Sequence, residues 1–117
     1  MANGVNGIVA LSVDSTDAFA LASFWQQLLG GDVTREGDDA ELVGGPVRID
    51  FLHVPEAKSV KNRLHLDVGS DDYEAAIAHA LRIGATRADD VFTTDEWQVM
   101  RDPEGNEFCI LRPSVDG

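Results

Sequence analysis

Val9, Leu11 and Val13 recur at every second position in residues 7–13, which predicts a β-strand with these side chains on one face, under the helix that follows. The next segment changes to helical spacing, because its apolar side chains recur at i, i+3, i+4 and i+7. Asp17 and its polar neighbours offer oxygen atoms for the helix N-cap, and Gly30 allows the helix to end. Three short strands are expected after the helix, at residues 32–36, 40–44 and 47–54.

The same order of elements returns in the second half of the chain. Apolar and polar residues alternate along residues 63–68, with Leu64, Leu66 and Val68 on the face expected under the second helix. The polar residues 70–72 can cap that helix, which ends at Gly84. Three further strands fit the remaining sequence, at about residues 86–93, 96–101 and 106–112. The second half therefore repeats the order strand, helix and three strands.

The two halves can be aligned residue by residue. Leu11 corresponds to Leu66 at an offset of 55, Asp17 to Asp71 at 54, and Phe51 to Phe108 at 57. We therefore predict a single α+β domain of two βαβββ modules, at about residues 7–54 and 63–112, whose sheets form one curved surface with a shared cleft. The alternative is chance periodicity in an ordinary α+β domain.

A tight turn is expected before the last strand. The segment Asp102-Pro103-Glu104-Gly105 fits a type I turn, since proline presets φ at the second position and glycine relaxes the exit. In the strand that follows, alternation separates Phe108 and Ile110 from the other face, which carries Glu107, Cys109 and Leu111. Cys109 is the only cysteine in the chain.

If each helix packs on one face of its sheet, the other face lines the cleft. Alternation then directs a second set of side chains into the cleft. Those taken as ligand contacts are Asp50, Leu52, Arg63, His65, Asp67 and Cys109, together with Trp97 at the start of the seventh strand. Trp25 falls on the buried stripe of the first helix and is expected in the core.

Composition narrows the class of protein. The 117 residues include 21 acidic and 9 basic residues, a net charge of −12 that argues against a nucleic-acid partner. The acidic excess favours solubility, or alternatively a pocket for cationic small molecules. No 18-residue apolar run predicts a membrane span, and a single cysteine that cannot form an intrachain disulfide fits the cytoplasm.

Three segments carry a family resemblance: FWQQLLGG, VPEAKSVKNRLHLDV and DPEGNEFCIL. With them, residues 7–112 resemble the vicinal oxygen chelate superfamily, which contains glyoxalase I, extradiol dioxygenases and bleomycin-resistance proteins. The resemblance implies the two-module fold, a small-molecule ligand and a homodimer. It leaves the activity open, because one fold hosts many functions.

The resemblance also implies where a divalent metal ion would be held. The four equivalent strand positions fall here on Ile8, Leu52, Arg63 and Cys109. Two of these are hydrocarbon side chains and one is a permanent cation, so we expect no metal cofactor. The alternative is a shifted site for a divalent metal ion, because Asp50, His65 and Asp67 lie one same-face step from these positions.

Several roles remain open for the cleft residues. Cys109 is either a small wall residue or a nucleophile that uses His65 as its base. His65 either contacts a ligand or is a satisfied core histidine, and Trp97 is either a stacking wall or core. Arg63 either pairs with Asp50 or Asp67 or grips a ligand carboxylate.

Two functions follow from these alternatives. The first is a metal-independent protein that binds and sequesters a small molecule, of the glyoxalase or bleomycin-resistance type. The second is a lyase, isomerase or dioxygenase of the same superfamily. It would use the shifted metal site or a metal-free set in which Arg63 holds an oxyanion, His65 transfers a proton and Asp67 or Asp50 orients the imidazole.

Overall fold

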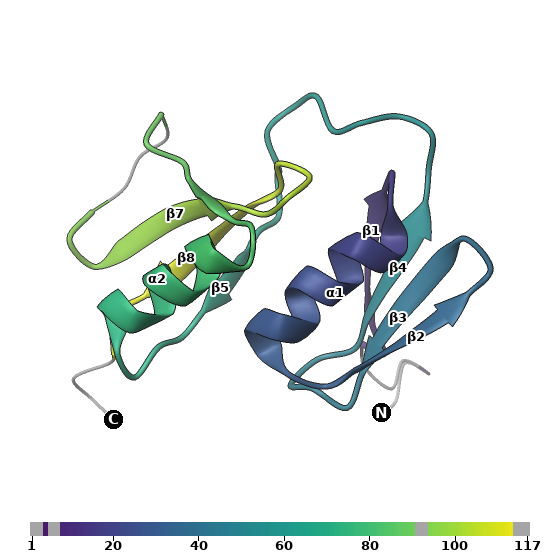
Figure 1. Cartoon of the computed structure of the whole chain (residues 1–117), viewed down its shortest axis with the longest axis horizontal. Helices are drawn as coiled ribbons and strands as arrows, with labels where there is room; N and C mark the ends of the chain where they lie inside the picture. Colours follow the sequence, from purple (N-terminus) through teal and green to yellow (C-terminus); the bar gives the residue numbers. More distant parts are fainter. Residues whose placement is uncertain (1–3, 5–7, 91–93, 114–117) are drawn as a thin grey trace. The chain divides into compact units, whose positions relative to one another are not determined.

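The computed structural model describes residues 4, 8–90 and 94–113. These residues form two compact units, Met1–Glu56 and Ala57–Gly117 (Figure 1). Each unit contains the predicted order of strand, helix and three strands, so the α+β class and the two βαβββ modules are confirmed. Neither helix in the described part of the chain has the length and apolar character needed to span a bilayer.

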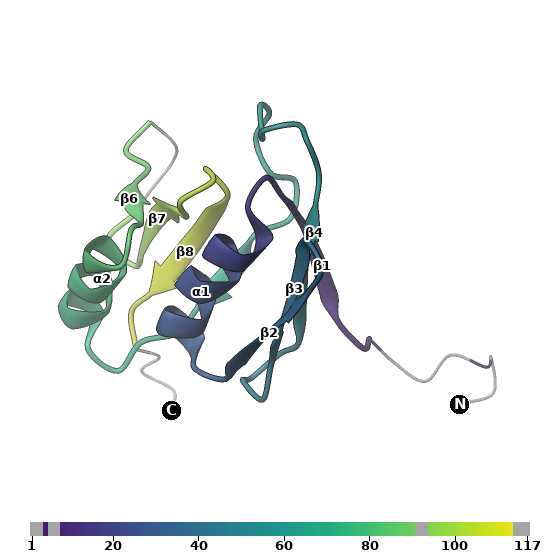
Figure 2. The ribbon, with the colours of Figure 1, turned by 45° about the vertical axis from the view of Figure 1, so that its right-hand side comes forward.

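The first unit packs one helix on a four-stranded mixed sheet. Its elements are β1 (Leu11–Ser15), α1 (Ala18–Leu29), β2 (Asp32–Glu36), β3 (Asp39–Val43) and β4 (Ile49–His53). The strand order is β1-β4-β3-β2, in which β1 and β4 are parallel and the other pairs are antiparallel. Helix α1 contacts all four strands and lies along one face of this sheet (Figure 2).

Local chemistry fixes the two ends of α1. The Asp17 carboxylate accepts a hydrogen bond from the Ala20 N–H at 3.1 Å, as expected of an N-cap. Gly30 ends the helix with a φ of 83°, a conformation that glycine adopts without a Cβ penalty. Between these ends, Leu21 and Trp25 are buried, which confirms Trp25 as a core residue. They are part of the hydrophobic core of the first unit.

The second unit repeats the arrangement. Its elements are β5 (Leu66–Val68), α2 (Tyr73–Arg82), β6 (Thr86–Arg87), β7 (Trp97–Arg101) and β8 (Glu107–Leu111). The strand order β5-β8-β7-β6 matches that of the first unit, and α2 contacts β6 and β8. Strand β6 is shorter than predicted, and residues 91–93 of that prediction lie outside the described residues.

Strand pairing corrects the alignment of the two modules. Leu11 pairs with Ile49, whereas Leu66 pairs with Phe108, so the offset at the last strand is 59 and the match of Phe51 to Phe108 was wrong. The error arose because a slip of two residues preserves the alternation of buried and exposed side chains. The equivalent of Cys109 is therefore Asp50 and not Leu52. The predicted match between the helix caps is also corrected, because the N-cap of α2 that corresponds to Asp17 is Asp72 and not Asp71.

The first strand of each unit begins later than predicted. Val9 and Leu64 were expected under the helices, but their exposed fractions are 83% and 86%. In the first unit, the N–H of Leu11 donates to the carbonyl of Arg48, just before β4 begins. In the second unit, Leu64 lies level with the turn that precedes β8, so it has no strand beside it. Pairing, and not the apolar pattern alone, therefore sets the start of each strand.

Candidate functional site

The turn before β8 sets the phase of the strand that carries Cys109. The Gly105 N–H donates to the Asp102 carbonyl at 2.9 Å, which confirms the predicted turn. The buried Asp102 carboxylate also accepts hydrogen bonds from the N–H groups of Glu104 and Asn106, at 2.9 and 3.0 Å. These bonds fix the entry into β8, so its side chains cannot exchange faces without breaking the turn.

Strand register then places Cys109 in the middle of a row of side chains. Cys109 pairs with Asp67 on the parallel strand β5 and with Val99 on the antiparallel strand β7. Phe108 and Ile110 alternate with it and are fully buried toward α2. The face of the second sheet that lies away from α2 is called here the open face, and Asp67, Cys109 and Val99 cross it side by side.

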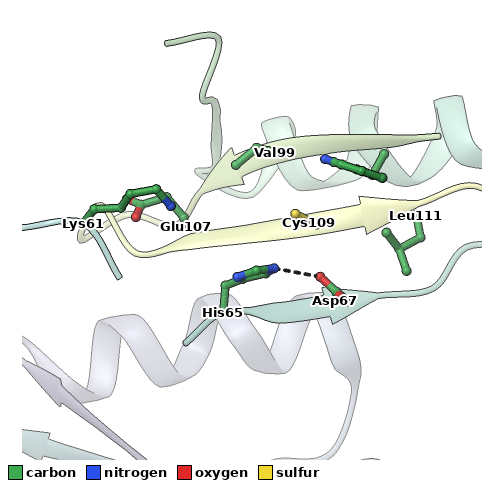
Figure 3. Close-up of a pocket in the computed structure, with 8 residues that line it drawn as sticks. Lys61, His65, Asp67, Val99, Glu107, Cys109 and Leu111 are labelled. Carbon is green, nitrogen blue, oxygen red and sulfur yellow. Dashed lines mark ion pairs between the residues drawn. The ribbon is translucent and has the colours of Figure 1, made fainter. Parts of the chain in front are cut away.

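A pocket of about 350 Å³ lies over the open face (Figure 3). One side of it is apolar, with Val99 and Leu111 beside Trp97, which pairs with Leu111 across β7 and β8. The remaining lining carries hydrogen-bonding and charged groups. The full lining consists of Lys61, His65, Asp67, Trp97, Val99, Glu107, Cys109 and Leu111, all from the second unit.

Three of these side chains converge at the centre of the pocket. His65 Nε2 lies 3.2 Å from Asp67 Oδ1, and Figure 3 marks this ion pair, with Cys109 labelled nearby. One ligand-type atom from each of His65, Asp67 and Cys109 lies within 4.8 Å of the others. The group therefore combines an imidazole nitrogen, a carboxylate oxygen and a sulfur on one side of a rigid sheet.

The surroundings of Cys109 keep its thiol protonated. Burial raises the pKa of Cys109, and the negative charge of Asp67 and its hydrogen bond to the thiol raise it further. The charge of Lys61 acts in the opposite direction and is outweighed. A nucleophilic cysteine needs a lowered pKa, so these surroundings speak against that alternative. The side chain, 7% exposed, packs instead with Ala88 and Val99 in the pocket wall.

Glu107 ties the preceding loop to one end of the pocket. Its side chain is 5% exposed and accepts from the Asn62 N–H at 3.0 Å, from Lys58 Nζ at 3.3 Å and from Arg101 Nε at 3.4 Å. Burial alone would raise the pKa of Glu107, but these donors and their charges outweigh burial and lower it. Glu107 is therefore an ionised anchor that holds the loop from which Lys61 reaches the pocket.

The structure brings together four of the seven predicted ligand contacts: His65, Asp67, Trp97 and Cys109. Arg63 is exposed and is not among the lining residues, so the proposed set of Arg63, His65 and Asp67 is not assembled there. Asp67 pairs with His65 rather than with Arg63.

Asp50 and Leu52 belong to the first unit. Asp50 pairs there with Arg48 at 3.0 Å, and Arg48 also contacts Glu41. The cleft shared by both modules stays a prediction.

Two residues that line the pocket, Val99 and Lys61, were not predicted from the sequence. Val99 follows from alternation along β7, since it lies two residues after Trp97 on the same face. Lys61 lies in an irregular loop, where no periodicity indicates its direction. Glu107 and Leu111 were placed on the correct face but were not taken as ligand contacts.

The family model described as a glyoxalase-like domain matches residues 10–111. The chain belongs to the glyoxalase-like domain family. None of the curated proteins matches this glyoxalase-like chain.

Solved structures share the fold of this glyoxalase-like protein. A glyoxalase/bleomycin resistance protein/dioxygenase family enzyme from Burkholderia phytofirmans is 20% identical, with a TM-score of 0.73 over 91% of this chain and 98% of that one. The fosfomycin resistance protein FosX from Listeria monocytogenes is 8% identical, with a TM-score of 0.74 over 96% and 94%. The fosfomycin resistance protein FosX from Mesorhizobium loti is 9% identical, with a TM-score of 0.73 over 96% of this chain and 95% of that one. At these identities the likeness shows the fold alone.

Three of the four positions that the resemblance assigns to metal ligands do not suit a cation. Ile8 and Leu52 carry no donor atom, and Arg63 is a cation. Asp50, which strand pairing puts in the place of Leu52, is already paired with Arg48 in the first unit. The group of His65, Asp67 and Cys109 is different, because each member has a donor atom and the three lie together. This donor set keeps Cys109 and replaces the other assigned positions by His65 and Asp67, and it fits a divalent ion in chemistry and spacing.

Proposed function

We propose that this glyoxalase-like protein binds a small organic molecule over the open face of its second sheet, to sequester or recognise it in a resistance-type role. The observation that carries the proposal is the combination of an apolar wall and a few converging polar groups in one pocket of about 350 Å³. Small-molecule sites have this composition and a volume of about 300–1,000 Å³. Trp97 and Leu111 supply the apolar contact, and His65 and Asp67 supply orientation.

Binding without turnover is supported by the state of the reactive groups. The Cys109 thiol stays protonated, and the Glu107 carboxylate already accepts three hydrogen bonds. A general acid–base set with Arg63 would need that guanidinium in the pocket, and Arg63 does not line it. These side chains favour recognition of a ligand over acid–base or nucleophilic chemistry.

Charge supports a cationic ligand. The chain has a net charge of −12, and the Asp67 carboxylate is 54% exposed at the pocket. An exposed carboxylate beside an aromatic side chain suits an organic cation, because the carboxylate can form a charge-assisted hydrogen bond and the ring a cation–π contact. Solved structures of similar fold are named for bleomycin and fosfomycin resistance, so both compounds are natural first probes. Bleomycin is cationic, whereas fosfomycin is an anionic phosphonate and tests the expected preference for cations.

The second candidate function is an enzyme of the same superfamily, such as a lyase, isomerase or dioxygenase. The observation that favours it is the donor group of His65, Asp67 and Cys109 inside the pocket. A divalent ion held there would act as a Lewis acid toward a ligand oxygen. The absence of a metal, as expected from the sequence, stays a prediction.

The assembly and location are also proposals. We propose a homodimer in the cytoplasm, on the strength of the family resemblance and of the single cysteine, which forms no intrachain disulfide. Light scattering of the purified full chain tests the dimer, and a monomer at micromolar concentration would contradict it.

Calorimetric titration tests the proposed function. The panel consists of small organic cations together with fosfomycin and bleomycin, and at least one compound should bind the wild type with an affinity that Leu111→Ser weakens. Leu81→Ser is the matched control, because Leu81 is a partly exposed leucine on α2 and lies outside the pocket. Equal affinity in wild type and Leu111→Ser would contradict the pocket as the binding site. If Leu52→Ser also weakened ligand affinity, that result would support the cleft shared by the two modules.

A further inference from the structure

We propose that His65, Asp67 and Cys109 form a binding site for one borderline-soft divalent cation of the Zn²⁺ class. Cys109 stands at one of the positions that the family resemblance assigns to metal ligands, whereas His65 and Asp67 lie outside those positions. It shares the pocket of the proposed function and deepens the metal-dependent candidate. The binding of an organic ligand is a separate property with its own test.

The backbone already brings the two strand-borne donors together. Asp67 and Cys109 are register partners on parallel strands, so hydrogen bonding within the sheet holds their Cβ atoms close. His65 lies two residues before Asp67 and extends over the same face. Two ligands are therefore on neighbouring strands, and the third follows from alternation along the chain.

The donor atoms need only small rotations to enclose an ion. Zn²⁺ binds nitrogen and oxygen at about 2.0–2.2 Å and sulfur at about 2.3 Å, so tetrahedral ligands lie about 3.3–3.8 Å apart. Here all three donors lie within 4.8 Å of one another, and His65 and Asp67 are 3.2 Å apart. Cys109 is buried and fixed, whereas the side chains of His65 and Asp67 are 46% and 54% exposed and have room to rotate.

The donor types select the class of cation. Sulfur and imidazole nitrogen favour Zn²⁺ over Mg²⁺ or Ca²⁺, which prefer oxygen ligands. On uptake, the sulfur–hydrogen bond of Cys109 breaks, its proton leaves to solvent, and the sulfur electron pair binds the ion. An ion of this class held by three protein ligands would have one further coordination position. That position is where an oxygen of an organic ligand or a water molecule would bind.

The charges around the three donors allow a cation to enter. Asp67 contributes one negative charge to the pocket, and the Cys109 thiolate would contribute a second on binding. Lys61 is the lysine among the lining residues, and Arg63 does not line the pocket. The charge of Glu107 is already balanced by Lys58 and Arg101, so it does not compete for the ion.

Titration of the metal-stripped full chain with Co²⁺, followed by competition with Zn²⁺, tests this site. A thiolate bound to Co²⁺ gives a near-ultraviolet charge-transfer band, and Cys109 is the only cysteine that can produce it. We expect this band to saturate at one Co²⁺ per chain and to be abolished by Zn²⁺. His65→Gln and Asp67→Asn should each weaken Co²⁺ binding by about tenfold or more.

The matched controls are His53→Gln and Asp71→Asn, exposed residues of the same types outside the pocket. Both should bind Co²⁺ like the wild type. No thiolate band at saturating Co²⁺ would overturn the proposal. The proposal would also be overturned if wild type, His65→Gln and Asp67→Asn bound Co²⁺ with equal affinity in this assay. Equal affinities are what a lone thiol would give. Leu111→Ser should bind Co²⁺ normally, which separates failure of this site from failure of the organic-ligand pocket.

Discussion

Asp67 and Cys109 face each other across the parallel strands β5 and β8, with the carboxylate beside the thiol. Side chains that face each other on neighbouring strands lie close enough to interact. Here the pairing joins an exposed acid to a buried cysteine in the floor of a pocket. The pair therefore controls the ionisation of the thiol and gives the pocket two of its three donor atoms.

The thiol of Cys109 should react slowly. In the metal-stripped protein at neutral pH, iodoacetamide should alkylate Cys109 much more slowly than it alkylates the chain unfolded in urea. The physical reason is that burial and Asp67 raise the pKa of Cys109 and so lower its thiolate fraction. Asp67→Asn removes the charge and should increase the rate, whereas Asp71→Asn should not. A folded wild type that reacts as fast as the unfolded chain would show that the thiol is exposed and ionised.

Replacement of Glu107 by glutamine should destabilise the fold. The substitution removes a buried negative charge that accepts from Asn62, Lys58 and Arg101. We expect a loss of about 1–3 kcal/mol in the free energy of unfolding at pH 7, measured by urea denaturation. Glu56→Gln is the control, because Glu56 is exposed at the end of the first unit.

The Glu107 contribution should also depend on pH. Its folded-state pKa is lowered, so the stabilisation is present above the unfolded-state pKa of about 4.3 and is lost as the pH falls through the folded value. The difference between wild type and Glu107→Gln should therefore shrink toward acid pH. A difference that stayed constant or grew on acidification would show that Glu107 is not ionised in the folded protein.

The two helix caps should be energetically equivalent. Asp17 accepts from the Ala20 N–H and Asp72 from the Ala75 N–H, both at 3.1 Å. Asp17→Ala and Asp72→Ala should each reduce the free energy of unfolding by about 1 kcal/mol. Asp71→Ala, which the sequence alignment would equate with Asp17, should cost much less. If Asp71→Ala destabilised the protein more than Asp72→Ala, the assignment of Asp72 as the N-cap of α2 would be wrong.

The ion pairs of Arg48 should contribute little to stability. Arg48 contacts Asp50 and Glu41, but its side chain is 47% exposed, and pairs that solvent reaches are screened. Arg48→Gln should leave the denaturation midpoint almost unchanged, in contrast to Glu107→Gln. If Arg48→Gln lowered the free energy of unfolding as much as Glu107→Gln does, burial would not explain the difference between the ion pairs of Arg48 and those of Glu107.

Sequence periodicity was sufficient for the order of elements and for which face each strand presents. The turn at Asp102, the cap at Asp17 and the alternation that separates Cys109 from Phe108 all have local chemical signals. Register had no such signal, because a slip of two residues keeps every side chain on its face. For that reason Leu52 was equated with Cys109, whereas pairing assigns that place to Asp50.

The site could be predicted where the strand alternation holds or continues just beyond a strand. His65, Asp67 and Cys109 followed from alternation, and their convergence depends on β5 lying directly beside β8. Lys61 could not be predicted, because the loop that carries it is held by Glu107 through contacts between residues 45 positions apart. Arg63 was assigned to the cleft by extending the strand pattern beyond the residues that pair.

Backbone amide chemical shifts test most directly whether the open face of the second sheet binds the ligand. The probe is a compound that binds the wild type in the panel of organic cations, fosfomycin and bleomycin. On its addition, the largest shift changes should fall on Asp67, Val99, Cys109 and Leu111, which share the pocket. Changes confined to other surfaces, with these four residues unaffected at saturation, would contradict the account.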